Sequence, residues 1–262
     1  MIDIEKSKIA FKNFLEQHSD DEDKLGFNLK VVHTYHVAEN ARKIATKLNL
    51  NKEDIDLAEL IGLLHDIGRF DEIKVTGGMD KGNFNHGMYG SKILFEEGLI
   101  RSFIEDNKYD NIIKKAVENH NKLFIDDNLT DKELLHVKLI RDADKLDNYR
   151  VKKEEKIEAI FPGQVNSIEE MENSKISDKV YETILNKKLI DIKDRIYPLD
   201  YWLCILAFVF DMSYPVTFKM MQENDYINIV IDRFNYKNED TKSKMTTIRN
   251  LINGFIEERA NG

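Results

Sequence analysis

The strongest constraint on the fold is a helical spacing of apolar residues that runs along most of the 262-residue chain. Apolar side chains recur every three or four positions, and no segment shows the strict alternation that is typical of a half-buried strand. Prolines, which interrupt helices, occur at only three positions. The sequence therefore predicts an all-α protein with helices near residues 3–18, 30–48, 53–67, 86–97, 109–121, 131–147, 176–188, 197–211, 214–223 and 240–259.

Two breaks interrupt this helical pattern. Residues 71–85 contain three glycines and are predicted to form a loop, either a lid over a bound phosphate or a plain connector. A second break falls near residues 161–174. Because the later helices also have strong apolar faces, we expect one all-helical domain over residues 1–262, in which a C-terminal helical extension of about 160–262 packs on the core.

Charge and composition limit the classes of function. The formal net charge is −9, and 42% of the residues are hydrophobic, which allows a sizeable core. A broad nucleic-acid surface is not expected because it needs a basic patch, whereas a small phosphorylated ligand is compatible when a metal ion supplies local charge.

The sequence shows no signal peptide and no apolar run long enough to cross a membrane, so we expect a cytoplasmic protein. The single cysteine, Cys204, precludes an intramolecular disulfide.

The most informative motif is the pair His65–Asp66, which closes an almost continuously apolar helical segment, 57–64. Ionisable groups at the end of a buried helix are costly unless a partner compensates them, and a bound metal ion would do so. A solvated helix end is the alternative for this dipeptide taken alone.

His33 is the next candidate ligand. It lies on a helical face that also holds four apolar residues, Val37, Ala41, Ile44 and Leu48. We therefore expect the His33 side chain to point into the core. His36 shares its face with polar residues and is expected to be solvated or to lie at the rim of the site.

The segment 141–147 supplies further carboxylates. Asp144 shares one helical face with Val137 and Ile140 and is therefore predicted to be the buried carboxylate. Asp142 lies nearly opposite that face, so we expect it to be a surface residue or a group behind the ligands.

This combination resembles the signature of the HD-domain metal-dependent phosphohydrolases, with a histidine, a His-Asp doublet and a distant aspartate. The resemblance covers roughly residues 28–150, and the stretch 65–70 is similar to one bacterial branch of that family. Members are all-helical and cleave phosphomonoesters, nucleotides, cyclic nucleotides or dinucleotides. The resemblance implies that a divalent ion is held by His33, His65, Asp66 and Asp144.

Two more histidines, His86 and His120, are predicted to face inward. His86 begins a helix whose inner face would hold Gly90 and Ile93, and His120 ends an apolar helical stripe. Some branches of the HD family carry two extra histidines in this order, which implies a second ion on His86 and His120 with Asp66 as the bridge. Alternatively, both histidines bind phosphate or stabilise loops around a single ion.

The expected cofactor is one divalent ion or two. Nitrogen and oxygen ligands suit Mn, Fe, Co, Ni or Zn better than Ca, and Mg also stays open. The expected reaction is attack of metal-activated water on phosphorus, with Asp66 and Asp144 as the catalytic carboxylates. Arg69 and Lys145 would bind phosphoryl oxygens and Asp147 would orient a ligand or the water, with ordinary salt bridging as the alternative for all three.

We expect a metal-dependent phosphohydrolase whose partner is a small phosphorylated molecule, such as a nucleotide. Two other functions stay open. A regulatory metal or nucleotide sensor would keep the site but show little turnover. A di-iron oxygenase is the second alternative, because some HD-like proteins with extra histidines oxidise small molecules.

Overall fold

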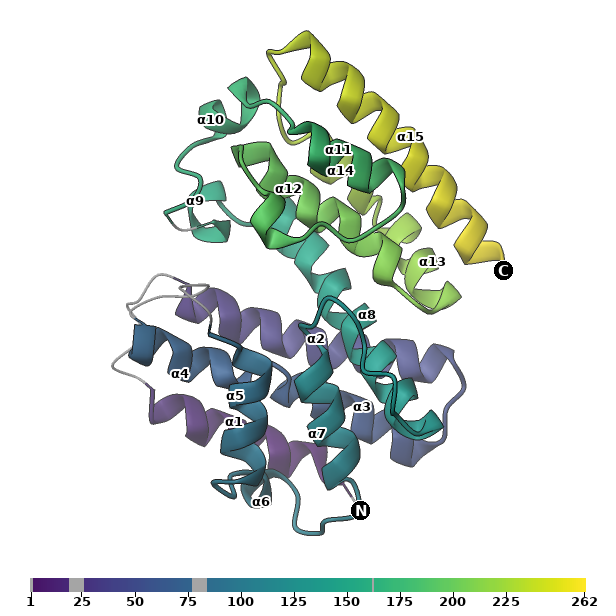
Figure 1. The fold of residues 1–262 in the computed structure, drawn as a ribbon. Helices are drawn as coiled ribbons and strands as arrows, with labels where there is room; N and C mark the ends of the chain where they lie inside the picture. Colours follow the sequence, from purple (N-terminus) through teal and green to yellow (C-terminus); the bar gives the residue numbers. More distant parts are fainter. Residues whose placement is uncertain (1, 19–25, 77–83, 162) are drawn as a thin grey trace. The chain divides into compact units, whose positions relative to one another are not determined.

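The computed structural model describes residues 2–18, 26–76, 84–161 and 163–262. Every regular element within these ranges is helical and none is a strand, which confirms the all-α prediction (Figure 1). The chain divides into two compact units, Met1–Asp144 and Lys145–Gly262. That the C-terminal extension packs on the core as part of one domain stays a prediction.

The first unit contains the helices that carry the predicted ligands. α2 packs along α3, while α5 packs against both α4 and α7 (Figure 1). The elements of this unit are α1 (Ile4–Glu16), α2 (Phe27–Lys47), α3 (Lys52–Leu64), α4 (Ile67–Thr76), α5 (His86–Phe95), α6 (Ile100–Phe103), α7 (Asp110–Asn119) and the first part of α8 (Asp131–Glu154).

The second unit begins within α8. Its longest helix, α15, packs against α11, α13 and α14. The remaining elements of this unit are α9 (Ile157–Ile160), α10 (Ile168–Asn173), α11 (Asp178–Leu185), the 3-10 helix η2 (Ile192–Asp194), α12 (Pro198–Leu206), the 3-10 helix η3 (Ala207–Asp211), α13 (Pro215–Glu223), α14 (Tyr226–Ile231) and α15 (Glu239–Asn261).

One predicted helix is broken at the point where two of the predicted ligands lie. The sequence predicted a single helix over 53–67, but α3 ends at Leu64 and α4 begins at Ile67. His65 and Asp66 therefore occupy the junction between two helices. A junction frees their side chains from the strict spacing of a helix face.

The predicted loop over 71–85 is wrong in its first part. α4 continues to Thr76, because residues 69–76 contain neither glycine nor proline. Residues 77–83 lie outside the described residues, so the hypothesis of a lid over a phosphate stays a prediction.

The close packing of α2 on α3 brings two ligand-bearing segments together. A side-chain Cβ at Gly62 would lie only 2.6 Å from the Cα atom of Ala38, so only glycine permits this approach. The start of α3 is fixed by Asn51, whose side chain accepts a hydrogen bond from the backbone N–H of Asp54 at 2.9 Å. The end of α3, where His65 lies, is thereby held against the helix that carries His33.

Candidate metal centre

Six predicted ligand side chains converge within the first unit. They come from α2, the junction of α3 and α4, the first residue of α5, the residue after α7, and α8. Five of them are buried, with exposed fractions between 0% at His65 and 8% at His86. The structure groups them in two clusters of possible metal ligands, namely His33, His65 and Asp144, and Asp66, His86 and His120.

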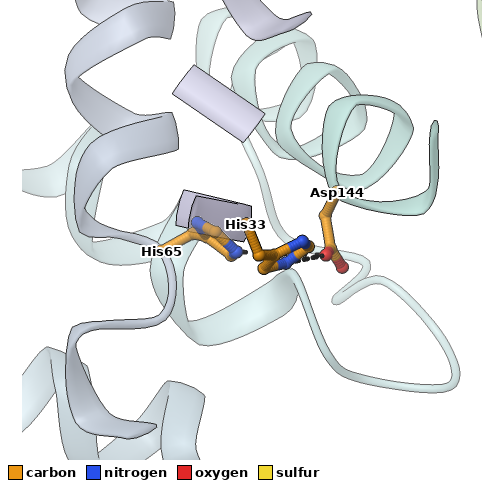
Figure 2. A group of neighbouring side chains, drawn as sticks. All are labelled: His33, His65 and Asp144. Atoms are coloured by element: carbon orange, nitrogen blue, oxygen red, sulfur yellow. Dashed lines mark ion pairs between the residues drawn. The ribbon is translucent and has the colours of Figure 1, made fainter. Parts of the chain in front are cut away.

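The first cluster joins α2, the α3–α4 junction and α8. Figure 2 shows the two imidazoles and the Asp144 carboxylate turned toward one another. Nε2 of His33 lies 3.0 Å from Oδ1 of Asp144, and Nε2 of His65 lies 3.9 Å from the same oxygen. The Asp144 side chain keeps an exposed fraction of 18%, so this cluster is reached by solvent from the Asp144 side.

The second cluster joins the α3–α4 junction to α5 and to the end of α7. Oδ1 of Asp66 lies 3.4 Å from Nε2 of His86 and 3.3 Å from Nε2 of His120. The two Nε2 atoms are themselves 3.1 Å apart. Both predicted inward-facing histidines are therefore buried and point at one carboxylate oxygen.

Asp66 connects the two clusters through its two carboxylate oxygens. While Oδ1 faces the second cluster, Oδ2 lies 3.6 Å from Nε2 of His65 and 3.9 Å from Nε2 of His33. One carboxylate placed in this way can bind an ion in each cluster.

Backbone carbonyl groups fix the orientation of two of the histidine rings. Nδ1 of His65 lies 2.7 Å from the carbonyl oxygen of Gly62, and Nδ1 of His120 lies 2.7 Å from that of Val117. Each Nδ1–H therefore donates to a carbonyl, and the lone pair of each Nε2 points into the site.

The protonation states also suit metal ligands. Burial lowers the pKa of His65 to about 4, and it lowers the pKa of His86 well below its usual value. Burial opposes ionisation of Asp66 and Asp144, but the charge of Lys30 lowers the pKa of Asp66 and the neighbouring His33 lowers that of Asp144. At neutral pH His65 and His86 are thus neutral imidazoles, and Asp66 and Asp144 are ionised carboxylates, which are the forms that bind metals.

These residues fit a divalent transition metal. Nε2 of His65 is buried and has no hydrogen-bond partner among the described residues, a situation that costs about 1–3 kcal/mol unless another group occupies the position. Imidazole nitrogens combined with carboxylate oxygens are the donors that Mn, Fe, Co, Ni and Zn accept. An ion in each cluster would satisfy the inward-facing nitrogens.

Two cations flank the Asp66 carboxylate. Nζ of Lys30 lies 2.8 Å from Oδ2 of Asp66, and Nε of Arg69 lies 3.9 Å from Oδ1. Arg69 also bonds Glu72 at 2.6 Å, and the Glu72 side chain is fully buried. Lys30 was not predicted from the sequence, although it precedes His33 by about one helical turn.

Two predicted substrate contacts have partners in the second unit. Nζ of Lys145 lies 2.8 Å from Oδ2 of Asp211. Asp147 is fully buried and accepts hydrogen bonds from Arg150 at 2.6 and 3.0 Å. Both residues therefore form salt bridges, which was the alternative given for them. A role in substrate binding stays a prediction.

Comparison with known protein families matches residues 31–149 to the HD domain. This stretch of the chain is an HD domain. It belongs to a superfamily whose members are generally metal-dependent phosphohydrolases, and it includes all six residues of the two clusters. Searches of curated proteins and of solved structures give no significant match to the chain. The bacterial branch suggested by residues 65–70 stays a prediction.

No helix among the described residues is both long enough and apolar enough to cross a membrane.

Of the two positions expected for Asp142, the surface position is wrong, and a position behind the ligands stays a prediction. Asp142 is fully buried, as are its neighbours from Leu139 to Ala143. Five consecutive buried residues cover the whole circumference of a helix, so α8 is enclosed on every side here. One apolar face predicts a solvent-exposed opposite face only for a helix at the surface, and this part of α8 does not lie at the surface. Asp144, predicted to be the buried carboxylate, is less buried than Asp142, because its side chain keeps an exposed fraction of 18%, but it does join the cluster with His33 and His65.

Substitution of these two aspartates by the isosteric asparagine separates their roles. We expect Asp144→Asn to weaken metal binding by at least about tenfold, because it removes a charged ligand. Asp142→Asn should keep the metal affinity within a small factor, since Asp142 belongs to neither cluster. Metal content after dialysis checks both variants. Loss of metal from Asp142→Asn together with retention in Asp144→Asn would reverse the assignment.

A pair of glycines lets α4 approach α5 in the HD domain. A Cβ atom at Gly68 would lie 2.3 Å from the carbonyl oxygen of His86 and 2.7 Å from the backbone nitrogen of Gly90. Backbone atoms cannot move aside as a flexible side chain does. Gly68 therefore sets the distance between Asp66, which precedes α4, and His86, which begins α5.

We expect Gly68→Ala to lower the free energy of unfolding by about 1–3 kcal/mol and to weaken metal binding by the second cluster. Gly254→Ala is the matched control, because a Cβ at this helical position in α15 meets nothing within 4 Å. The control should be neutral or more stable by up to about 1 kcal/mol. Denaturant unfolding and metal titration test both. Unchanged stability and metal binding in Gly68→Ala would contradict this expectation, because α4 and α5 would then move apart without a cost in free energy.

Proposed function

We propose that the HD domain is a metal-dependent phosphohydrolase that cleaves a phosphoester of a small molecule, with a nucleotide or a related phosphate as substrate. The ligands proposed for the first ion are His33, His65, Asp66 and Asp144. For a second ion we propose Asp66, His86 and His120.

A single observation carries the proposal. The two oxygens of Asp66 face different clusters, each of which holds two histidines within 3.9 Å of that carboxylate. Two ions that share a carboxylate can stabilise both the attacking and the leaving oxygen of an in-line displacement. A structural site for a single ion would need neither the extra histidines nor the bridging position.

The chemistry needs an activated water and charge on the phosphoryl oxygens. When bound, divalent ions supply positive charge to those oxygens and make a water molecule more acidic. The protein must hold the ligands in fixed positions, and the hydrogen bonds from His65 and His120 to backbone carbonyls do so. Burial of the histidines limits competing water around them.

Lys30 is the better placed of the two flanking cations for binding a phosphoryl oxygen. Its side chain contacts the carboxylate that an ion would take over, so its ammonium would gain a new anionic partner beside the ion. Arg69 instead keeps a short bond to the buried Glu72. We therefore propose Lys30 as the main substrate cation and Arg69 as a second one.

Lys30→Met should raise KM and lower kcat/KM by about 10–100-fold, the value of a charge-assisted hydrogen bond. Metal binding should stay equal or become tighter, because a competing positive charge leaves Asp66. Lys43→Met is the control on the same helix, where Lys43 is half exposed and pairs with Glu39 at 2.6 Å. Weaker metal binding with an unchanged KM would contradict the role given to Lys30.

A phosphoester screen tests the proposed function. The purified chain is freed of metal by chelation and assayed with Mn²⁺, Co²⁺, Ni²⁺, Zn²⁺, Mg²⁺ or Fe²⁺. The substrates are nucleoside mono- and diphosphates, cyclic nucleotides, dinucleotides and aryl phosphates. We expect phosphate or nucleotide release that depends on added metal and is absent in Asp66→Asn.

The same screen separates the other functions. A chain that binds metal and nucleotide without hydrolysing any of the phosphoesters would favour a sensor. Oxygen uptake by the iron-loaded protein, with no phosphoester cleavage, would favour an oxygenase. Either result would overturn the proposed phosphohydrolase.

A further inference from the structure

A buried arginine on α8 contacts the end of the helix that carries the second cluster. Arg141 has an exposed fraction of 1% and is among the largest fully buried side chains of the described residues. It precedes Asp144 by one helical turn, so the same helix bears a ligand of the first cluster. Nothing in the proposed chemistry uses Arg141 directly.

Arg141 donates to carbonyl groups where α7 ends. Its Nη1 lies 2.6 Å from the carbonyl oxygen of Asn119, 2.7 Å from that of Lys122 and 3.3 Å from that of His120. The last carbonyls of a helix lack partners within the helix and carry partial negative charge. A fixed guanidinium satisfies several of them at once, which a smaller side chain cannot do.

The residues held in this way build the second cluster. The His120 ring is oriented by the Val117 carbonyl in the last turn of α7. The side-chain amide of Asn121 lies 3.3 Å from Nδ1 of His86. A Cβ at Gly87 would lie 2.8 Å from that same Val117 carbonyl oxygen, so α5 is seated directly on the end of α7.

We propose that Arg141 is a positioning residue for the second ion. By holding the carbonyls of 119, 120 and 122, it fixes the turn that aims His120 at Asp66 and sets Asn121 behind His86. α8 thus serves both ions, the first through Asp144 and the second through Arg141. This inference rests on the proposed two-ion site.

Metal titration of the full chain tests the role of Arg141. Metal-free wild type, Arg141→Lys and Arg141→Met are titrated with Mn²⁺ or Co²⁺ alone, and thermal unfolding is measured in parallel. His120→Ala identifies which binding event belongs to the second cluster. Arg42→Lys is the control, because Arg42 pairs with Glu59 at 2.7 Å and neither residue is a proposed ligand.

We expect Arg141→Lys to weaken the same binding event that His120→Ala removes, by about tenfold or more, and to leave the other event within about threefold. Arg141→Met, without the charge, should weaken it further. If Arg141 had only a structural role, its replacement would weaken both metal-binding events to a similar extent. Arg42→Lys should leave both affinities as in the wild type.

Three results would overturn the inference. The first is a second binding event that is unchanged in both Arg141 variants. The second is an equal weakening of both binding events together with a loss of thermal stability. In either case the wild type still binds two ions, so the proposed function stands while the role of Arg141 falls. A wild type that binds a single ion would instead end the two-ion proposal and this inference with it.

Discussion

Replacement of Asp66 by alanine is expected to abolish phosphoester hydrolysis and to remove both metal ions. The carboxylate faces two histidines in each cluster, so its loss takes a ligand from both ions together. Loss of metal charge at the phosphoryl group is worth several kcal/mol, so turnover should fall on the order of a thousandfold or more. Metal content and initial rates measure both effects.

Alanine variants of the other proposed first-ion ligands complete this test. His33→Ala, His65→Ala and Asp144→Ala should each lose the first ion and activity, because each removes one donor from the same cluster. His36, a half-buried residue of α2 that belongs to neither cluster, offers a control, and His36→Ala should retain metal and turnover. Full metal occupancy in His33→Ala would contradict the assignment of that ligand.

Replacement of either His86 or His120 by alanine is expected to separate the two ions. The second cluster would keep too few protein ligands, while the first cluster is untouched, so stoichiometry should fall from two ions toward one. The missing ion acts mainly on charge that develops in the transition state, so kcat should fall by about 100-fold or more with a smaller change in KM.

A one-ion enzyme would respond differently to the same two substitutions. If both histidines contact substrate phosphate, the variants would raise KM and leave the metal count unchanged. A count of one ion in the wild type and in both variants, under saturating metal, would end the two-ion proposal. Metal titration combined with steady-state kinetics distinguishes these outcomes.

Helical periodicity predicted much of the fold and the direction of the main ligands. His33 is buried because it shares a face with Val37, Ala41 and Ile44, all of which are fully buried. Val137 and Ile140, both buried, correctly indicated that Asp144 faces the cluster, although its side chain is partly exposed. His86 and His120 are buried as expected from their apolar neighbours. The burial of these residues follows from the spacing of apolar residues within a single helix.

The remainder depends on contacts between helices, which no single periodic pattern contains. Asp142 is buried because α8 is enclosed on all sides between Leu139 and Ala143. Lys30 reaches a carboxylate 36 residues away in the sequence. The need for glycine at position 68 arises from the backbone of α5. The break between α3 and α4 was not predicted, because residues 65–66, where it falls, are neither proline nor glycine.

The most direct test of the account is the number of ions bound by the unmodified chain. Metal-free protein is saturated with Mn²⁺ or Co²⁺, freed of excess metal, and analysed for metal and protein in the same sample. The two clusters around Asp66 predict two ions per chain, one of them lost in His120→Ala and both lost in Asp66→Ala. A wild-type chain that binds no ion at saturating metal would contradict the metal centre and the hydrolase built on it.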